Sequence, residues 1–171
     1  GQFIYGNTIG LNMGVVPWTV FFAWSPLVIG VWAIARKVCY KYAIPVAVAA
    51  LVVVDLVLDP VNATLGFWVW PQGGFFYGVP LSNFAGWIFS GAIGVFIAWR
   101  LFPRGLPITA SYSVFLTLLF VTTAAFWLCL LVPLLIGIGL LVWLYLYTLP
   151  QKLRYPIFPS NASFRKNRKN R

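Results

Sequence analysis

Five long apolar runs determine what this chain can fold into. They cover, approximately, residues 15–35, 43–58, 84–101, 109–130 and 133–149. About 20 apolar residues cross the roughly 30 Å of hydrocarbon in a bilayer, so runs of this length are typical of membrane spans. Helix is the expected form, because lipid requires each span to pair its own backbone polar groups. The continuous apolar character argues against the alternating pattern of an outer-membrane barrel. The sequence therefore predicts an all-α, polytopic integral membrane bundle of about five transmembrane helices.

The composition supports this class and suggests the domain organisation. Hydrophobic residues make up 61% of the 171-residue chain, and charged residues only 8%. A soluble domain has about a quarter charged residues, so a chain this poor in charge belongs in a membrane. We expect one transmembrane bundle over residues 1–150, followed by a basic tail over residues 151–171.

The fourth and fifth runs admit two interpretations. Residues 109–149 form either two spans joined tightly near Val132-Pro133 or one long broken helix. At 1.5 Å per residue, a continuous helix of this length would measure about 60 Å, twice the thickness of the hydrocarbon layer. Two spans are therefore favoured.

The positive charges predict the orientation of the bundle. In this topology all twelve Lys and Arg residues fall on one side: Arg36, Lys37 and Lys41 after the first run, Arg100 and Arg104 after the third, and the remainder after the fifth. The positive-inside rule makes that side cytoplasmic, which predicts a cytoplasmic C-terminus and a non-cytoplasmic N-terminus. The tail FRKNRKNR is typical of a solvated cytoplasmic segment, with contact to anionic lipid or to nucleic acid as the alternatives. Of these, nucleic acid is not an expected partner.

Residue types that the chain lacks also limit its chemistry. It contains no histidine, which excludes Ser-His and Cys-His nucleophiles and His-ligated haem. The two cysteines, Cys39 in a basic loop and Cys129 in an apolar run, are expected toward opposite faces of the membrane and do not make a zinc site without histidine. We expect no metal site, so any catalysis must use Asp, Tyr, Lys, Arg or backbone groups.

The only two acidic residues, Asp55 and Asp59, lie four residues apart at the end of the second apolar run. On a helix they share one face, with Cβ atoms roughly 6 Å apart. A carboxylate within the membrane usually marks a functional site or a water-filled cavity. Asp59 precedes Pro60, so a simpler interpretation is that it ends the span at the interface. Of two buried carboxyls, one can hold its proton while the other is ionised, which suits general acid catalysis such as protonation of an isolated alkene.

The segment that follows, residues 60–83, is dense in aromatic residues and glycines. The aromatics are Phe67, Trp68, Trp70, Phe75, Phe76 and Tyr77, and the glycines between them are Gly66, Gly73, Gly74 and Gly78. Aromatic residues at a membrane interface are ordinary anchors. Glycine and proline, however, let the backbone fold back into the bilayer where protein covers it, and aromatic faces stabilise a nearby cation. The segment is either an interfacial anchor or the wall of a slot for a long, flat polyene.

The third run begins with polar and small residues. Asn83 and Trp87 are expected on the same side of the membrane as the aspartates. Their polar groups could position a water molecule there, or Asn83 could simply cap the helix. Gly86, Ser90 and Gly94 follow at i,i+4 spacing. Such a stripe of small residues favours close helix packing, with a groove for a rigid lipid as the alternative.

The stretch from Asp55 to Trp87 resembles a known family. It reads D-x-V-L-D-P, then G-F-W-V-W, then G-G-F-F-Y-G-V-P-L-S-N-F-x-G-W. It resembles the membrane carotenoid hydratases of the γ-carotene 1',2'-hydratase and bisanhydrobacterioruberin hydratase type. The N-terminal segment from Tyr5 to Trp24, Y-G-N-T-I-G-L-x-M-G-V-V-P-W-T-V-F-F-A-W, also resembles the opening segment of that family. The resemblance covers roughly residues 3–149.

The resemblance implies addition of water to the terminal double bond of an acyclic carotenoid, without a cofactor. Asp55 and Asp59 are the catalytic candidates. The residues expected to contact the substrate or pigment are Tyr5, Trp24, Trp68, Trp70, Phe76, Tyr77, Asn83, Gly86, Trp87 and Ser90. The expected partners are a carotenoid and membrane lipid, in a bacterial inner or photosynthetic membrane.

Two other functions stay open on the sequence alone. A non-catalytic subunit of a photosynthetic membrane complex would use the same aromatic loop and small-residue stripe to bind a carotenoid, with other membrane proteins as partners. A transporter or channel subunit is less well supported, because one acid pair near one interface does not form a relay across the bilayer.

Overall fold

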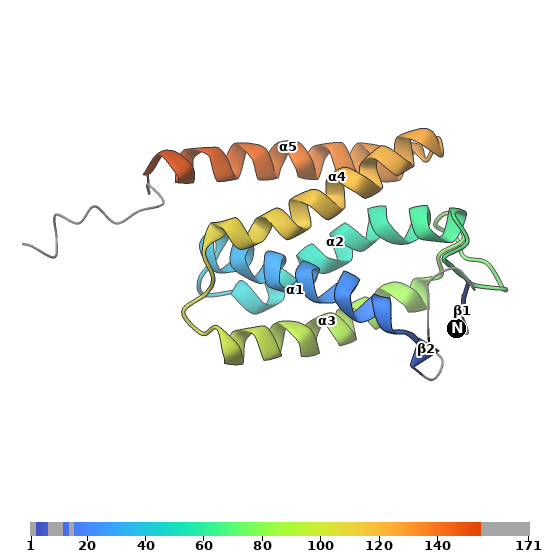
Figure 1. Cartoon of the computed structure of the whole chain (residues 1–171), viewed down its shortest axis with the longest axis horizontal. Coiled ribbons are helices and arrows are strands. Elements are labelled where there is room, and N and C mark those ends of the chain that lie inside the picture. The colour runs from blue at the N-terminus through green and yellow to red at the C-terminus, as the bar shows by residue number, and fades with distance from the viewer. Residues whose placement is uncertain (1–2, 7–11, 14–15, 155–171) are drawn as a thin grey trace, which may run out of the picture.

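The computed structural model, which describes residues 3–6, 12–13 and 16–154, is a bundle of long helices (Figure 1). The helices are α1 Trp18–Val38, α2 Ala43–Thr64, α3 Leu81–Leu101, α4 Tyr112–Trp127 and α5 Leu131–Arg154. A short 3-10 helix, η1 (Ile108–Ser111), leads directly into α4. Within the described residues, five helical segments are long and apolar enough to cross a membrane, with η1 and α4 counted together. The predicted all-α, polytopic membrane bundle is confirmed.

The second helix extends further than the sequence predicts. The second run was expected to end at residue 58, but α2 continues through Asp59-Pro60 to Thr64. Proline lacks an N–H and costs the helix one backbone hydrogen bond. The next turn is held by side chains, since Asn62 Nδ2 donates to the Leu58 carbonyl (2.8 Å) and Thr64 Oγ1 to the Pro60 carbonyl (2.7 Å). Asp59 is thus an interior helical residue, and the expectation that it ends the span is wrong.

The last two helices form an antiparallel pair, which confirms the prediction of two spans. The break lies at residues 128–130 and not near Val132-Pro133. Cys129 supplies the reversal with a left-handed φ of 55°. Pro133 is the third residue of α5, where a missing N–H is tolerated because the first turn has no intrahelical acceptor. Helix α5 continues past the predicted boundary at residue 150, and residues 155–171 of the predicted tail lie outside the described residues.

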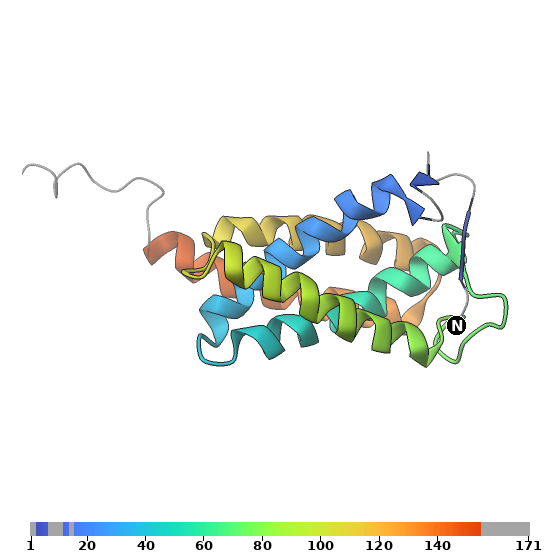
Figure 2. The same ribbon diagram turned by 90° about the horizontal axis from the view of Figure 1, so that it is seen from below.

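Helix α2 is at the centre of the bundle and packs against α1, α3, α4 and α5. Helix α1 also packs against α3 and α4, whereas α3 and α5 lie on the outside (Figures 1 and 2). The buried core includes Leu27 and Trp32 of α1, Leu51 of α2, Val95 of α3 and Leu118 of α4. The outer faces of α3, α4 and α5 carry exposed large apolar side chains, as expected of helices that contact lipid.

The described Lys and Arg residues all lie at one end of the bundle, in the last turns of α1, α3 and α5 and in the connections that follow α1 and α3. Arg36 joins two of these segments: its guanidinium donates to the Pro103 carbonyl (2.6 Å) and lies 3.9 Å from the ring centroid of Tyr40. Cys39 is also at this end, and Cys129 is at the other. Both are free cysteines. Their predicted placement at opposite faces is confirmed.

The uncharged end of the bundle is covered by the N-terminal segment and the α2–α3 loop (Figure 2). Strand β1 (Ile4–Tyr5) pairs antiparallel with β4 (Trp68–Val69), so that Tyr5 lies opposite Trp68. A second short pair joins β2 (Asn12–Met13) to β3 (Val16–Pro17). Further along the loop, Trp70 and Val79 are buried in a cluster with Phe84 of α3, whereas residues 71–75 between them are exposed.

A glycine in α5 offers a test of the helix packing. A Cβ added at Gly137 would lie 2.9 Å from Thr122 Cγ2 of α4, whereas one added at Gly139 meets nothing within 4 Å. We expect Gly137→Leu to destabilise the protein by about 1–3 kcal/mol through overpacking of the α4–α5 contact. The control Gly139→Leu should leave stability unchanged or raise it slightly, because leucine has the better helix propensity. Thermal unfolding in detergent, followed by tryptophan fluorescence, measures both; equal midpoints for the two variants would contradict the described packing.

Candidate functional site

The two carboxyl groups of the chain are buried together inside the bundle. Asp55 is 0% exposed and Asp59 2% exposed. They lie one turn apart on α2, on the same face, as their i,i+4 spacing predicts. Asp59 is five residues, or roughly 8 Å, from the end of α2 at Thr64, and Asp55 is one turn deeper. Both carboxyls therefore lie inside the membrane-spanning part of the helix.

A single amide holds the two carboxyls. Asn83, in the first turn of α3, donates from Nδ2 to Asp55 Oδ2 (3.1 Å) and to Asp59 Oδ2. An asparagine amide has two N–H donors, so one can serve each carboxyl. Trp87, one turn further along α3, donates from Nε1 to Asp59 Oδ2 (3.3 Å). The prediction that Asn83 and Trp87 lie on the aspartates' side is confirmed. The capping alternative for Asn83 is wrong, because the N-cap of α3 is Pro80.

Neutral groups surround the pair. The charged end of the bundle is distant, since Asp55 lies about 18 Å and Asp59 about 24 Å along α2 from Ala43. In the described ranges no three His, Cys, Asp or Glu residues gather into a group that could hold a metal ion. Two carboxyls this close cannot both ionise cheaply without a cation, so the arrangement favours a single negative charge and one proton held on the pair.

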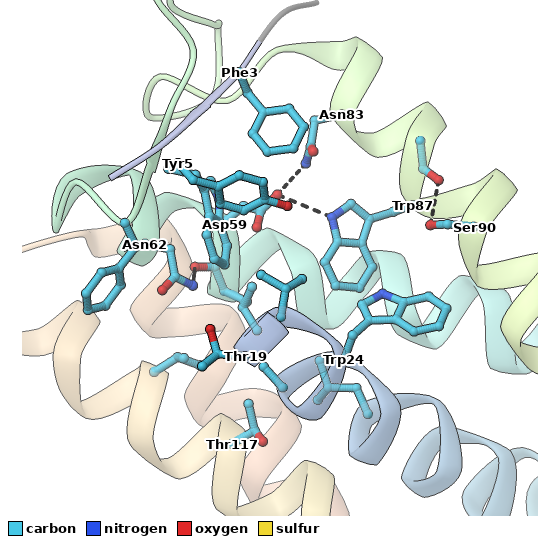
Figure 3. Close-up of a pocket in the computed structure, with 18 of the residues that line it drawn as sticks. Phe3, Tyr5, Thr19, Trp24, Asp59, Asn62, Asn83, Trp87, Ser90 and Thr117 are labelled. Carbon is cyan, nitrogen blue, oxygen red and sulfur yellow. Dashed lines mark hydrogen bonds between the residues drawn. The ribbon is translucent and has the colours of Figure 1, made fainter. Parts of the chain in front are cut away.

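A cavity of about 680 Å³ adjoins Asp59 (Figure 3). Its walls come from the N-terminal halves of α1 and α3, the last turns of α2, the middle of α4, and the segments around β1 and β4. Asp59 lines this cavity and Asp55 does not. Asp59 is thus the carboxyl that borders the cavity, while Asp55 lies behind it and interacts with it directly.

The path of α1 explains why a cavity forms here. The middle of α1 is packed tightly on both sides: Trp24 and Val28 lie against Gly94 of α3, and Gly30 lies against Val114 of α4. The Ser113 hydroxyl of α4 also donates a hydrogen bond to the Pro26 carbonyl of α1 (2.7 Å). Proline can accept this bond, because it lacks the backbone N–H but keeps its carbonyl. Toward its N-terminus α1 diverges from the bundle (Figure 2), and the cavity lies under this half.

The cavity lining is partly exposed at Phe120 of α4 and also between α1 and α3. Its exposed lining residues there are Ala23 on α1 and Gly86 and Ser90 on α3. A Cβ at Gly86 would meet nothing within 4 Å. Gly94 thus allows close packing against Trp24, as the helix-packing interpretation of the stripe expects, whereas Gly86 and Ser90 line the cavity. The groove for a rigid lipid stays a prediction.

Aromatic side chains form much of the remaining wall. Trp24 and Trp87 lie with ring centroids 6.5 Å apart, and Tyr5 and Trp68 pack edge to face at 6.4 Å. Burial raises the pKa of the Tyr5 hydroxyl above its ordinary value, and the neighbouring Asp59 carboxyl raises it further. Tyr5 is therefore a neutral hydrogen-bond donor across the physiological pH range.

The structure brings together most of the predicted site residues. Those that line the cavity are Asp59, Tyr5, Trp24, Trp68, Trp70, Asn83, Gly86, Trp87 and Ser90. Two predicted contacts, Phe76 and Tyr77, do not line it. Phe76 packs beside Phe84 under the loop, and the Tyr77 hydroxyl accepts a hydrogen bond from the Val132 N–H (3.3 Å) at the start of α5.

Several lining residues were not predicted. They include Phe3, Thr19, Asn62, Thr117 and Phe120. Asn62 follows Asp59 at i+3 spacing, so a helix drawn past Pro60 would have placed it on the same wall. The two α4 residues, Thr117 and Phe120, have no such signal, because nothing in the apolar run 109–130 marks which face looks inward.

Comparisons with known proteins agree with this picture. A family model described as "Carotenoid biosynthesis protein" matches residues 1–149. The chain is also similar to bisanhydrobacterioruberin hydratase from Haloarcula japonica, with 36% identity over 106 residues, which is 57% of this chain and 35% of the relative. It thus spans about a third of the length of the curated relative it matches. No solved structure matches the chain. The family match covers all five helices down to residue 149 and the whole cavity wall, and on this ground the chain belongs to the carotenoid biosynthesis protein family.

Proposed function

We propose that this chain adds water to the terminal double bond of an acyclic carotenoid, with Asp59 as the proton donor. The observation that carries the proposal is the position of Asp59: a buried carboxyl, held by the neutral donors Asn83 and Trp87, that borders a large cavity with many aromatic residues in its wall. The family match and the similarity to a hydratase support a carotenoid as the substrate class.

The reaction balances without a cofactor. The protonated Asp59 carboxyl transfers its proton to the less substituted carbon of the terminal C=C bond, which leaves a tertiary carbocation on the other carbon. A water oxygen forms the new C–O bond, and the proton that this water loses returns to the Asp59 carboxylate. The net change is one water molecule added across the double bond, and the acid is regenerated for the next cycle.

The surroundings of Asp59 suit each stage of this reaction. Trp24, Trp68 and Trp87 line the cavity near the carboxyl, and aromatic faces stabilise a nearby cation by about 0.5–2 kcal/mol each. Once Asp59 has given up its proton, its own carboxylate, which Asn83 and Trp87 continue to hold, supplies the negative charge that stabilises the carbocation. We assign Asp59 contact with the substrate and Asp55 the role of positioning Asp59.

The opening between α1 and α3 is the proposed route for the polyene. A carotenoid is longer than the bundle is wide, so one end must occupy the cavity while the rest lies in lipid. Gly86 and Ser90 lie at this opening, where a side chain longer than serine would narrow it. This arrangement gives the terminal double bond access to Asp59 without moving the polyene out of the membrane.

The first prediction concerns the proton donor. Asp59→Asn keeps the shape and an acceptor oxygen but cannot donate an acidic proton, so hydrated carotenoid should fall at least about a hundredfold. Asp55→Asn should lower it less, because Asp55 does not face the cavity. The measurement is liquid chromatography of carotenoids from a host that makes the acyclic precursor and expresses each variant at an equal level.

An undiminished hydrate peak for Asp59→Asn would contradict the acid assignment. A larger loss for Asp55→Asn than for Asp59→Asn would exchange the two roles. If the wild-type chain instead purified with unchanged carotenoid at a fixed ratio and formed no hydrate, the cavity would be a binding site without chemistry.

The second prediction concerns the opening. Gly86→Leu would fill the gap between α1 and α3, and we expect hydrate formation to drop at least about tenfold, mainly through weaker substrate binding. Gly139→Leu is the matched control, because Gly139 is also a helix glycine with open space around it but lies on α5, outside the cavity. Hydrate formation is compared at equal folded protein, judged by monodispersity in detergent. Equal activity of the two variants would exclude this route.

The third prediction concerns the orientation of the bundle in the membrane. We propose that the end with all the described Lys and Arg residues faces the cytoplasm. Cys39 at that end and Cys129 at the other are built-in reporters. A membrane-impermeant maleimide should label Cys129 in intact spheroplasts and Cys39 only in inverted vesicles. Cys39→Ser and Cys129→Ser identify each signal, and the reverse pattern would overturn the orientation.

A further inference from the structure

Hydration needs a water molecule held at the carbocation, and the carboxyl pair does not by itself provide for it. In an apolar cavity the cation has a competing fate: it returns a proton from a neighbouring carbon to the Asp59 carboxylate and becomes an alkene again. A side chain that holds water beside the cation decides between the two outcomes. This requirement follows from the proposed function, on which the inference rests.

Most polar groups of the cavity are already engaged. The Asn83 amide and the Trp87 indole N–H donate to the carboxyls. The hydroxyls of Ser90 and Thr117 donate to carbonyls of their own helices, at 2.8 and 2.9 Å, and lie on α3 and α4 rather than on the helix that carries the acid. The Tyr5 hydroxyl also lies near Asp59, but it comes from the N-terminal segment. On the helix that carries the acid, the candidate is Asn62.

Asn62 is oriented to accept a hydrogen bond. Its Nδ2 donates to the Leu58 carbonyl at 2.8 Å, which fixes the amide plane. No hydrogen bond from a described group to its Oδ1 is found, and the half-buried side chain lines the cavity. At i+3 from Asp59, its Cβ lies about 5–6 Å from that of the acid. Figure 3 shows Asn62 on the opposite side of Asp59 from Asn83 and Trp87.

We propose that Asn62 Oδ1 holds the water that attacks the carbocation. A water between Asn62 and Asp59 donates one O–H to Asn62 Oδ1 and, once the proton has left the acid, the other O–H to the Asp59 carboxylate. Its lone pair then points into the cavity. The water oxygen forms the C–O bond, and the proton released passes to Asp59. Asn83 holds the acid on one side, and Asn62 holds the nucleophile on the other.

The test separates protonation from water capture. Membranes that contain the full chain are incubated in D2O with an acyclic carotenoid that has a free terminal double bond. The hydrate is measured by liquid chromatography, and deuterium in the recovered precursor is measured by mass spectrometry. Deuterium enters the precursor whenever Asp59 donates D⁺ and the cation then loses H⁺ without capturing water.

Two variants that match each other in shape isolate the acceptor. In Asn62→Thr, the new hydroxyl can donate to the Leu58 carbonyl, as threonines in helices often do, and can still accept a hydrogen bond from water. In Asn62→Val, the side chain has the shape of threonine and neither ability. We expect Asn62→Val to lose hydrate at least about tenfold while precursor deuteration continues or rises, and Asn62→Thr to recover part of the lost hydrate.

Each other outcome counts against the inference in a different way. Equal hydrate from Asn62→Val and the wild type would show that Asn62 does not hold the water. Joint loss of hydrate and deuteration in Asn62→Val would assign Asn62 to the acid step or to the fold. Equal loss of hydrate in Asn62→Val and Asn62→Thr would mean that hydrate formation does not depend on a hydrogen-bond acceptor at this position. A wild-type chain that yields neither hydrate nor deuterated precursor would refute the proposed function itself.

Discussion

The burial of two carboxyl groups in an apolar bundle is the constraint on which the rest of this structure depends. Leaving a buried polar group without a hydrogen bond costs about 1–3 kcal/mol, and more for a charged one. Since the described Lys and Arg residues lie at the far end of the bundle, the carboxyls need neutral donors. Asn83 and Trp87 supply them from α3, which must therefore begin beside the last turns of α2. In the loop between the two helices, the inward-facing Trp70 and Val79 hold α3 in this position.

The same requirement accounts for how the N-terminal segment is placed. Strand β1 pairs with β4 in the α2–α3 loop and so brings Tyr5 beside Asp59. The chain then enters α1, whose middle is packed between α3 and α4 while its first turns diverge. The cavity under these turns borders Asp59, although only 2% of that residue is exposed. The middle of α1 thus packs against its neighbours and stabilises the bundle, whereas the first turns of α1 leave the space that forms the cavity.

Much of this could be predicted from the sequence, for physical reasons that also show where prediction stops. Apolar runs of about 20 residues, and charges confined to alternate connections, determine the helices and their up-and-down order. The spacing of Asp55 and Asp59 predicts a shared face, and the order of Asn83 and Trp87 along the chain predicts their side of the membrane.

The course of the chain at Pro60 was not predictable from local preference, because the side chains of Asn62 and Thr64 and the packing of α2 compensate for the lost hydrogen bond. For this reason the sequence did not point to Asn62. That Asp59 rather than Asp55 faces the cavity also depends on where α1 and α3 separate, which no local pattern encodes.

The small-residue stripe of α3 illustrates how one pattern serves two needs in a membrane protein. In lipid, close helix contact relies on small residues, because apolar side chains gain little by leaving lipid for protein. Gly94 fits this rule, since the Trp24 ring occupies the space that a side chain would need. Gly86, two turns earlier on the same face, borders open space because α1 has already diverged. In the proposed reaction, the amphipathic product would leave between α1 and α3 with its new hydroxyl last, since the polar group would form at the Asp59 end of the cavity. In the proposed reaction, entry of the polyene end between α1 and α3 would therefore also set the direction in which the hydrated end withdraws.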